Sequence, residues 1–229
     1  MDALTDYQGF TLQYHDVARK VEKLHIMMEA AGIKKGDRIA VCGRNSAHWA
    51  VAFIATLTYG AVIVPILHEF NGEQIHNIVN HSESRLLFVG DYVVNIINAD
   101  EMPQLEGIFN LPDFSLHTSR NEKLTDARER LNELFGVKYP NAFRRDEIHW
   151  HVDTPEELCW INYTSGTTGF SKGVMLPYRA LWGNIDFCQK YLGTYMPRFS
   201  RMLSILPMAH MYGLAVEFLF AFCSGYHLF

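Results

Sequence analysis

Short buried strands alternate with helices in the first 111 residues, and this order constrains the fold more than any other feature of the sequence. Arg38 to Cys42 has the composition of a buried strand, Ser46 to Thr58 that of a helix, and Ala61 to Val64 that of a second strand. Because the connections hold only a few residues, the two strands are expected to lie parallel with the helix crossing between them. The sequence therefore predicts an α/β fold of wound, mainly parallel β-sheets with flanking helices.

Further elements repeat this order on both sides. Helical spacing of Ile75, Ile78 and Val79 predicts a helix over 72–80, and the apolar runs 86–89 and 106–111 predict strands. Before them, apolar residues at steps of four, three and four predict a first helix that closes at Gly32. These apolar residues are Val17, Val21, Leu24 and Met28.

One uncharged stretch, the 19 residues from Trp49 to Leu67, has the length of a membrane-spanning helix. Tyr59 and Gly60 divide it into an alanine-rich half and a β-branched half, and Pro65 is expected to end the second half. We therefore interpret the stretch as a helix followed by a strand, with no transmembrane segment.

A change of composition divides the chain. Arg120 to Glu147 holds seven cations and six acids in 28 residues, which is typical of a solvated segment, although a docking surface for a partner is the alternative. We predict a first α/β subdomain over 1–114 and a polar excursion or connector over 115–150. Residues 151–229 are predicted to start a second α/β layer that is truncated at its C-terminal end.

Charge and cysteines limit the partners and the compartment. Twenty Lys and Arg against 25 Asp and Glu give a net charge of −5, which argues against a nucleic-acid partner. The first residues lack both the basic and the apolar part of a secretory signal, so we predict a cytoplasmic protein. Buried, reduced thiols are predicted for Cys42, Cys159, Cys188 and Cys223, which lie in apolar stretches without metal-binding spacing.

The segment from Thr164 to Gly173 has the residues of a phosphate-binding loop. It follows a predicted strand over 158–163 and precedes the apolar run 174–176 and a helix that starts at Pro177. Three glycines can turn backbone N–H groups inward, five hydroxyls add donors, and Lys172 adds a positive charge. The P-loop pattern does not fit, because Ser171 precedes the lysine and Gly173 follows it.

The run from Tyr163 to Val174 resembles the signature loop of the adenylate-forming superfamily, which contains acyl-CoA synthetases, firefly-type luciferases and peptide-synthetase adenylation domains. Weaker matches follow the family order at 10–14, 57–65 and 206–214, so the resemblance spans nearly the whole chain. Ser171 stands where the family usually has proline. Since proline fixes φ, we expect a looser or differently capped loop rather than lost binding.

The resemblance implies a fold and a two-step reaction. The chain would be the first part of the large N-terminal domain of an adenylate-forming enzyme. In such enzymes a carboxylate attacks the α-phosphate of ATP to give an acyl-adenylate and pyrophosphate, and a thiol, usually that of coenzyme A, then takes the acyl group. ATP, Mg²⁺ and coenzyme A are the implied cofactor and co-substrates.

The resemblance also implies roles for particular residues. Lys172 and His210 would be catalytic, Thr164 would lie near the magnesium ion, and the acyl pocket and reacting carboxylate would lie beside His210, Met211, Tyr212 and Gly213. The β- and γ-phosphates would be bound by Thr164, Ser165, Gly166, Thr167, Thr168, Gly169 and Lys172.

Later motifs of the family, including those for adenine, ribose and the C-terminal lysine, are not found in this sequence. We therefore expect an N-terminal fragment, inactive by itself, of a parent most like the long-chain fatty acid–CoA ligases, to which the segment 206–213 is most similar. An adenylation domain for an amino or aryl acid is the alternative parent, and a non-catalytic nucleotide-binding fold is the alternative for the fragment. A carrier-protein thiol as acceptor, peripheral membrane contact and a homodimer are compatible with this interpretation.

Overall fold

In this computed structural model, which describes residues 1–164 and 172–229, the wound layer forms one larger sheet. Its strand order is β7-β6-β5-β3-β4-β8-β9, and the strands from β6 to β8 run parallel while β7 and β9 are antiparallel edges. The predicted α/β fold with mainly parallel strands is thus confirmed. The strands are β3 (Arg38–Cys42), β4 (Val62–Ile66), β5 (Ser84–Val89), β6 (Gly107–Asn110), β7 (Leu116–Ser119), β8 (Leu158–Thr164) and β9 (Lys172–Pro177).

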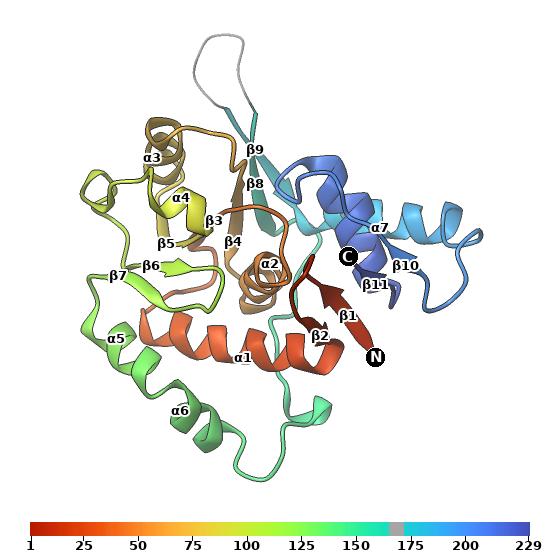
Figure 1. The fold of residues 1–229 in the computed structure, drawn as a ribbon, viewed down its shortest axis with the longest axis horizontal. Helices are drawn as coiled ribbons and strands as arrows, with labels where there is room; N and C mark the ends of the chain where they lie inside the picture. The colour runs from red at the N-terminus through yellow and green to blue at the C-terminus, as the bar shows by residue number, and fades with distance from the viewer. Residues whose placement is uncertain (165–171) are drawn as a thin grey trace.

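Helices cover both faces of this sheet (Figure 1). On one face α1 and α2 share a hydrophobic core with strand residues such as Ile39 and Val41. On the other face α3 and α4 pack on the intervening residues Ala40 and Cys42. Because side chains alternate across a strand, the continuous apolar runs of the sequence supply both cores. The helices are α1 (Tyr14–Ala30), α2 (Ala47–Tyr59), α3 (Gly72–His81) and α4 (Asp91–Val94).

The uncharged stretch from Trp49 to Leu67 folds as a helix followed by a strand, as predicted. Ser46 caps α2 by accepting a hydrogen bond from the backbone N–H of Trp49 at 3.1 Å. Gly60 ends α2 in the left-handed conformation, with a φ of 85° that glycine adopts without strain. Within the described residues, no helix combines the length and apolarity needed to cross a membrane.

The expectation that Pro65 ends the second strand is wrong. β4 continues through Pro65, which pairs with Val41 of β3, and ends at Ile66. On the other side of β4, the pairing with β8 is at Ile63, two residues earlier. Proline is tolerated at position 65 because the N–H that it lacks would point towards β8, and β4 is no longer paired with β8 at this position.

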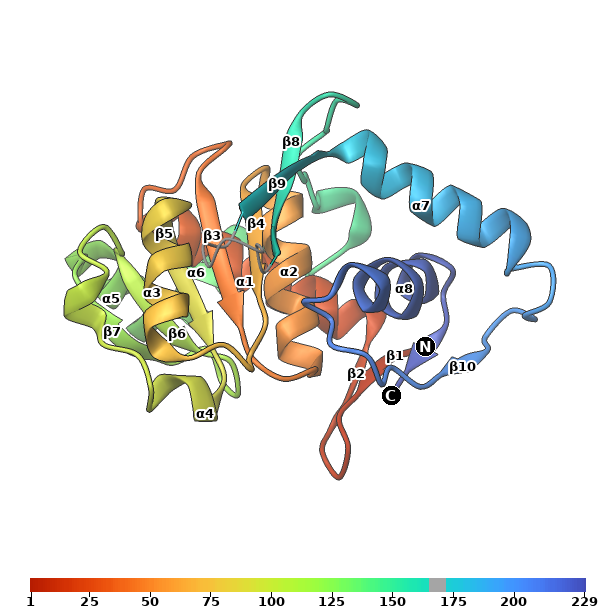
Figure 2. The same cartoon turned by 90° about the horizontal axis from the view of Figure 1, so that it is seen from above.

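A second, smaller sheet has the order β10-β11-β1-β2 and combines the first and last strands (Figure 2). β1 pairs in parallel with β11 through Leu4 and Leu228, and antiparallel with β2. Beside this sheet, α7 packs against a π-helix, η3. These elements are β1 (Asp2–Thr5), β2 (Thr11–Gln13), α7 (Tyr178–Tyr191), β10 (Arg201–Met202), η3 (Gly213–Phe220), α8 (Ala221–Cys223) and β11 (His227–Leu228).

One buried carboxylate holds part of the polar excursion against α1. Glu22 is 1 % exposed, and its oxygens accept hydrogen bonds from Lys138 Nζ at 2.7 Å, Tyr139 OH at 2.5 Å and Trp150 Nε1 at 2.5 Å. Burial acts to raise the pKa of Glu22, but the hydrogen bonds from His25 and these three groups lower it well below its usual range. The short elements of the excursion and the segment before it are η1 (Ala99–Glu101), α5 (Glu122–Glu129), α6 (Leu131–Lys138) and η2 (Arg145–Glu147).

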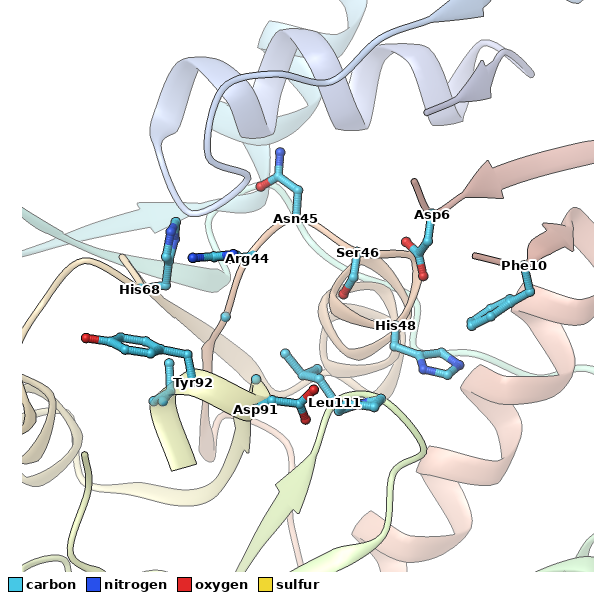
Figure 3. Close-up of a pocket in the computed structure, with 14 residues that line it drawn as sticks. Asp6, Phe10, Arg44, Asn45, Ser46, His48, His68, Asp91, Tyr92 and Leu111 are labelled. Atoms are coloured by element: carbon cyan, nitrogen blue, oxygen red, sulfur yellow. The ribbon is translucent and has the colours of Figure 1, made fainter. Parts of the chain in front are cut away.

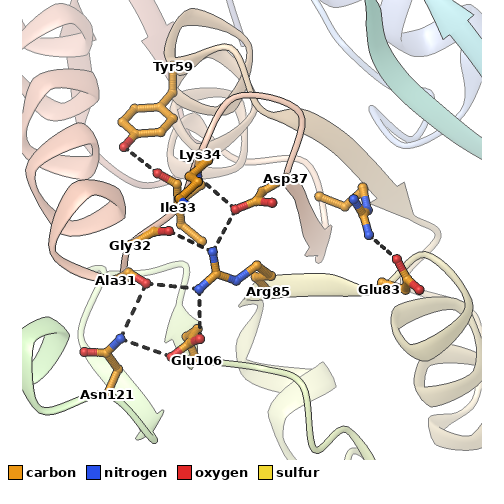
Figure 4. Close-up of polar contacts among 11 residues, drawn as sticks. Ala31, Gly32, Ile33, Lys34, Asp37, Tyr59, Glu83, Arg85, Glu106 and Asn121 are labelled. Atoms are coloured by element: carbon orange, nitrogen blue, oxygen red, sulfur yellow. Dashed lines mark hydrogen bonds and ion pairs between the residues drawn. The ribbon is translucent and has the colours of Figure 1, made fainter.

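An arginine joins α1 to the amino ends of the parallel strands (Figure 4). Arg85 donates to the carbonyls of Ala31 and Gly32 just beyond α1, at 3.3 and 2.8 Å. It also forms ion pairs with Asp37 at 2.7 Å and Glu106 at 2.8 Å. One side chain from β5 thus donates to both carbonyls beyond the end of α1, and Asn121 Nδ2 also donates to the Ala31 carbonyl, at 3.4 Å. This edge of the sheet lies opposite the carboxyl ends of the strands.

The cysteine prediction holds at three of four positions. Cys42, Cys159 and Cys188 are buried free thiols, whereas Cys223 is exposed, because it lies in the final turn formed by α8. In the larger sheet, β8 and β9 extend the layer begun by β3 and β4. The division of the chain at 114 and 150 stays a prediction.

Candidate active site

The β8–β9 hairpin positions the two ends of the predicted phosphate loop. β9 pairs antiparallel with β8, and its last pair joins Thr164 to Lys172. The predicted phosphate-binding residues between them, together with Ser171, lie outside the described residues: Ser165, Gly166, Thr167, Thr168 and Gly169. Two of the predicted residues, Thr164 and Lys172, are therefore side by side at the open end of the hairpin.

Both of these side chains are exposed. In the part of the chain that the structure describes, the Thr164 hydroxyl and the Lys172 ammonium make no hydrogen bond or ion pair. A lysine without a nearby carboxylate keeps its charge available to an anion such as a phosphate. This donor set, one hydroxyl and one ammonium, fits a magnesium-bound polyphosphate.

The residues that flank this pair fix the end of the hairpin. The buried phenol of Tyr163 lies 2.7 Å from His81 Nδ1, which ties β8 to α3. Burial raises the pKa of Tyr163, so the phenol keeps its proton. A Cβ on Gly173 would lie 2.9 Å from Ile161 Cγ2 and 3.1 Å from the Tyr163 ring. Glycine after Lys172 therefore lets β9 approach β8 closely.

His210 lies in the loop between β10 and η3, which we call the His210 loop (206–213). Its imidazole is exposed, while Met208 and Ala209 anchor the loop in the core. The Nδ1 of His210 accepts a hydrogen bond from the backbone N–H of Tyr212 at 3.3 Å. An imidazole that accepts at Nδ1 carries a proton on Nε2, so the exposed Nε2–H of His210 is available as a hydrogen-bond donor.

The other predicted residues of this loop differ in exposure. Met211 and Tyr212 are 43 % and 57 % exposed, whereas Gly213 is buried at the start of η3. A Cβ on Gly213 would lie 2.5 Å from the carbonyl oxygen of Pro207, so only glycine allows the loop to close at this point. Among the described residues, no hydrogen bond joins the His210 loop to Thr164 or Lys172.

Two side chains that the sequence analysis did not single out hold the His210 loop. Asn45, between β3 and α2, binds the loop backbone at Leu206 and Met208. Glu217 of η3 accepts hydrogen bonds from the backbone N–H groups of Ile205 and Leu206, both at 2.9 Å. The only sequence signal for Asn45 was its place beside the helix-capping Ser46. Leu206 and Met208 lie 161 and 163 residues away along the chain, and no local pattern reveals such a contact.

A cavity of about 410 Å³ opens at the carboxyl ends of β3, β5 and β6 (Figure 3). Arg44, His68 and Tyr92 gather at one side of it, and Phe10 and His48 lie at the other. Burial and a nearby lysine lower the pKa of His48, so its imidazole is neutral near pH 7.

This cavity lies at a topological switch point, because the connections after β3 and β5 lead to helices on opposite faces of the sheet. Open α/β sheets bind ligands at such points. None of the predicted site residues in the described part of the chain lines the cavity. The connection 43–46 forms one wall and, through Asn45, also holds the His210 loop.

Known proteins resemble this chain along most of its length. Long chain acyl-CoA synthetase 3 of Arabidopsis thaliana is 26 % identical over 211 residues, covering 89 % of this chain and 31 % of that protein. Fatty acyl-CoA synthetase A of Dictyostelium discoideum is 25 % identical over 226 residues, covering 93 % of this chain and 32 % of that protein. This chain thus spans about a third of the length of these relatives.

Solved structures share the fold. Apo MatB from Rhodopseudomonas palustris superposes with a TM-score of 0.76 at 22 % identity, covering 100 % of this chain and 42 % of the solved chain. The family described as AMP-binding enzyme matches residues 1–229, which is the whole sequence. The resemblance of the 163–174 loop to the adenylate-forming superfamily is therefore confirmed, and the chain belongs to the AMP-binding enzyme family.

Proposed function

We propose that residues 1–229 form the N-terminal part of an ATP-dependent acid–thiol ligase that activates a fatty acid and transfers it to coenzyme A. The observation that carries this proposal is the hairpin that sets Thr164 beside Lys172 in a chain matched throughout by the AMP-binding family. The long-chain and fatty acyl-CoA synthetases among the relatives support a fatty acid as the substrate.

In the first step, a carboxylate oxygen would attack the α-phosphorus of ATP, and the bond to the β-phosphate oxygen would break to release pyrophosphate. The Lys172 ammonium would neutralise the developing charge on the departing phosphates. At 4 Å and an effective dielectric constant of about 20, one such charge pair interacts by about 4 kcal/mol before desolvation is subtracted. The Thr164 hydroxyl would help to hold Mg²⁺, which would supply further positive charge to the phosphates.

The acid would be oriented by the His210 loop. His210 would donate its Nε2–H to the reacting carboxylate, while the Nδ1 contact with Tyr212 keeps the ring in that orientation. In the second step, the thiolate of coenzyme A would attack the acyl carbon of the adenylate and expel AMP. Met211 and Tyr212 would line the acyl pocket beside His210.

Two alternatives differ in the substrate or in activity. An adenylation domain for an amino or aryl acid would release pyrophosphate with those acids instead. Isolated residues 1–229 would be a nucleotide-binding fold without catalysis. Cytoplasmic location, peripheral membrane contact and a homodimer stay predictions.

The decisive experiment measures ATP-dependent pyrophosphate release by the complete polypeptide that contains residues 1–229. The acids would range from acetate to palmitate and include a benzoate and several amino acids. We expect release with long-chain acids, followed by acyl-CoA formation when coenzyme A is added. If none of the acids gave pyrophosphate release, the assignment as an enzyme would be refuted. Release only with amino or aryl acids would establish the alternative substrate.

A further inference from the structure

Asn45 connects the His210 loop to the carboxyl end of β3. Its side-chain Nδ2 donates to the carbonyl of Leu206 at 2.7 Å, and its Oδ1 accepts from the backbone N–H of Met208 at 2.7 Å. The two bonds lie on either side of Pro207. They fix both the distance and the rotation of this segment relative to the wound sheet.

These partners require an amide at position 45. The Leu206 carbonyl can only accept and the Met208 N–H can only donate, so the side chain must offer one donor and one acceptor on the same planar group. An aspartate would keep the bond to Met208 but would turn a carboxylate oxygen towards the Leu206 carbonyl. An alanine would leave both backbone groups without these partners.

The segment that Asn45 binds is also connected to His210 by backbone hydrogen bonds. The backbone N–H of His210 bonds the carbonyl of Pro207 at 2.9 Å, and the Leu214 N–H bonds the His210 carbonyl at 2.9 Å. The position of His210 therefore depends on the backbone at 206–208, which Asn45 holds. Glu217 fixes the preceding residues from the other side, and it belongs to a π-helix, a conformation frequent at functional sites.

We propose that Asn45 is a positioning residue for acid activation, which holds the His210 loop so that His210 Nε2 meets the reacting carboxylate. This inference rests on the proposed function. Asn45 does not itself contact the acid or ATP in this scheme. Its effect is therefore expected on the use of the acid and not on the binding of ATP.

The first test measures amide hydrogen exchange in Asn45→Ala and Asn45→Asp. In Asn45→Ala the Met208 N–H loses its acceptor, so its exchange should become faster by roughly tenfold or more. Asn45→Asp keeps an acceptor oxygen and should retain most of the protection. A matched control is Asn184→Ala, because among the residues that the structure describes the Asn184 side chain bonds only the Ala180 carbonyl, one turn back in α7. Unchanged Met208 exchange in Asn45→Ala would overturn the inference.

The second test measures steady-state pyrophosphate release by the complete polypeptide. In Asn45→Asp we expect kcat/KM for the acid to fall about tenfold or more, while the KM for ATP stays within about twofold of wild type. Asn184→Asp, the matched control for charge, should leave both unchanged. If Asn45→Asp changed the KM for ATP by as large a factor as kcat/KM for the acid, the role of Asn45 would be merely structural and the inference would be overturned. If wild type releases no pyrophosphate, the proposed function fails, and with it the role of Asn45 in acid activation.

Discussion

Thr164 and Lys172 are paired partners at the end of the β8–β9 ladder, although seven residues separate them along the chain. This pairing brings a hydroxyl and an ammonium to the same point. The mouth of the predicted phosphate loop is therefore built on two strands of the sheet and not on a free connection.

Lys172→Ala should weaken Mg-ATP binding by about 10- to 150-fold, because hydrogen bonds between charged groups contribute about 1.5–3 kcal/mol. Lys172→Arg should retain part of the affinity. Isothermal titration calorimetry on residues 1–229 measures both variants. Lys190→Ala is the control, since Lys190 lies over the Tyr191 ring at the far end of α7. Equal affinities of wild type and Lys172→Ala would remove Lys172 from the phosphate site.

Glu22→Gln should lower the free energy of unfolding by about 2 kcal/mol at pH 7, because it removes a buried carboxylate that several donors share. The pKa of Glu22 is lowered in the folded state, so its contribution is complete above the ordinary carboxyl pKa of 4.5. The contribution is then lost as the pH falls towards the folded pKa. Urea unfolding between pH 3 and pH 8 should show wild type and variant converging only on the acid side.

The control for this pH dependence is Glu29→Gln. Glu29 lies on the same helix but is exposed and forms no ion pair within the described residues. The difference in unfolding free energy between Glu29→Gln and wild type should therefore stay nearly constant over the same pH range. A Glu22→Gln difference that stays constant down to pH 3 would show that the lowered pKa of Glu22 does not stabilise the fold.

Gly213→Ala should destabilise the protein by about 1–3 kcal/mol, because the new methyl group would meet backbone oxygens of the His210 loop. For Gly183→Ala in α7 we expect the opposite effect on stability. A Cβ there meets nothing within 4 Å, so alanine should stabilise the helix by about 0.5–1 kcal/mol. Thermal unfolding followed by circular dichroism compares the two. A stabilising effect at position 213 would contradict the close contact with Pro207.

Arg85→Met should lower the unfolding free energy by about 2 kcal/mol, since it leaves the carbonyls beyond α1 and two carboxylates without their common partner. Arg130→Met, which breaks exposed ion pairs with Asp126 and Glu133, should leave the midpoint of chemical unfolding nearly unchanged. Equal midpoints for the two variants would argue against the Arg85 network as a structural connection.

Local patterns predicted the elements of the fold well. β3 was predicted with its observed bounds, and the predicted helix 46–58 differs from α2 by one residue at each end. Apolar spacing, a capping serine and a C-terminal glycine determine these bounds, and all three are visible in the sequence. The prediction for Pro65 was wrong because a strand tolerates proline where the lost N–H has no partner on the neighbouring strand. That neighbour of β4 is β8, which lies about 100 residues later in the sequence.

Candidate residues for the site could be singled out from the sequence only where one continuous segment supplies them. Thr164, Lys172 and His210 were predicted in this way from two short motifs, and their roles stay predictions. Asn45 and Glu217 were not, because their roles arise from contacts between segments that only the fold brings together. Glu22 was missed for the same reason, since a glutamate in an amphipathic helix gives no sign that three distant donors bury it.

The parallel pair Leu4 and Leu228 has a consequence for how the chain folds during synthesis. Of the two strands that pair with β1 in the described part of the chain, β2 follows it directly, whereas β11 is made more than 200 residues later. At 5–20 residues per second that interval is about 10 to 45 seconds. The wound sheet can form in this time, but one edge of β1 must wait unpaired, open to chaperones or to the same edge of another nascent chain.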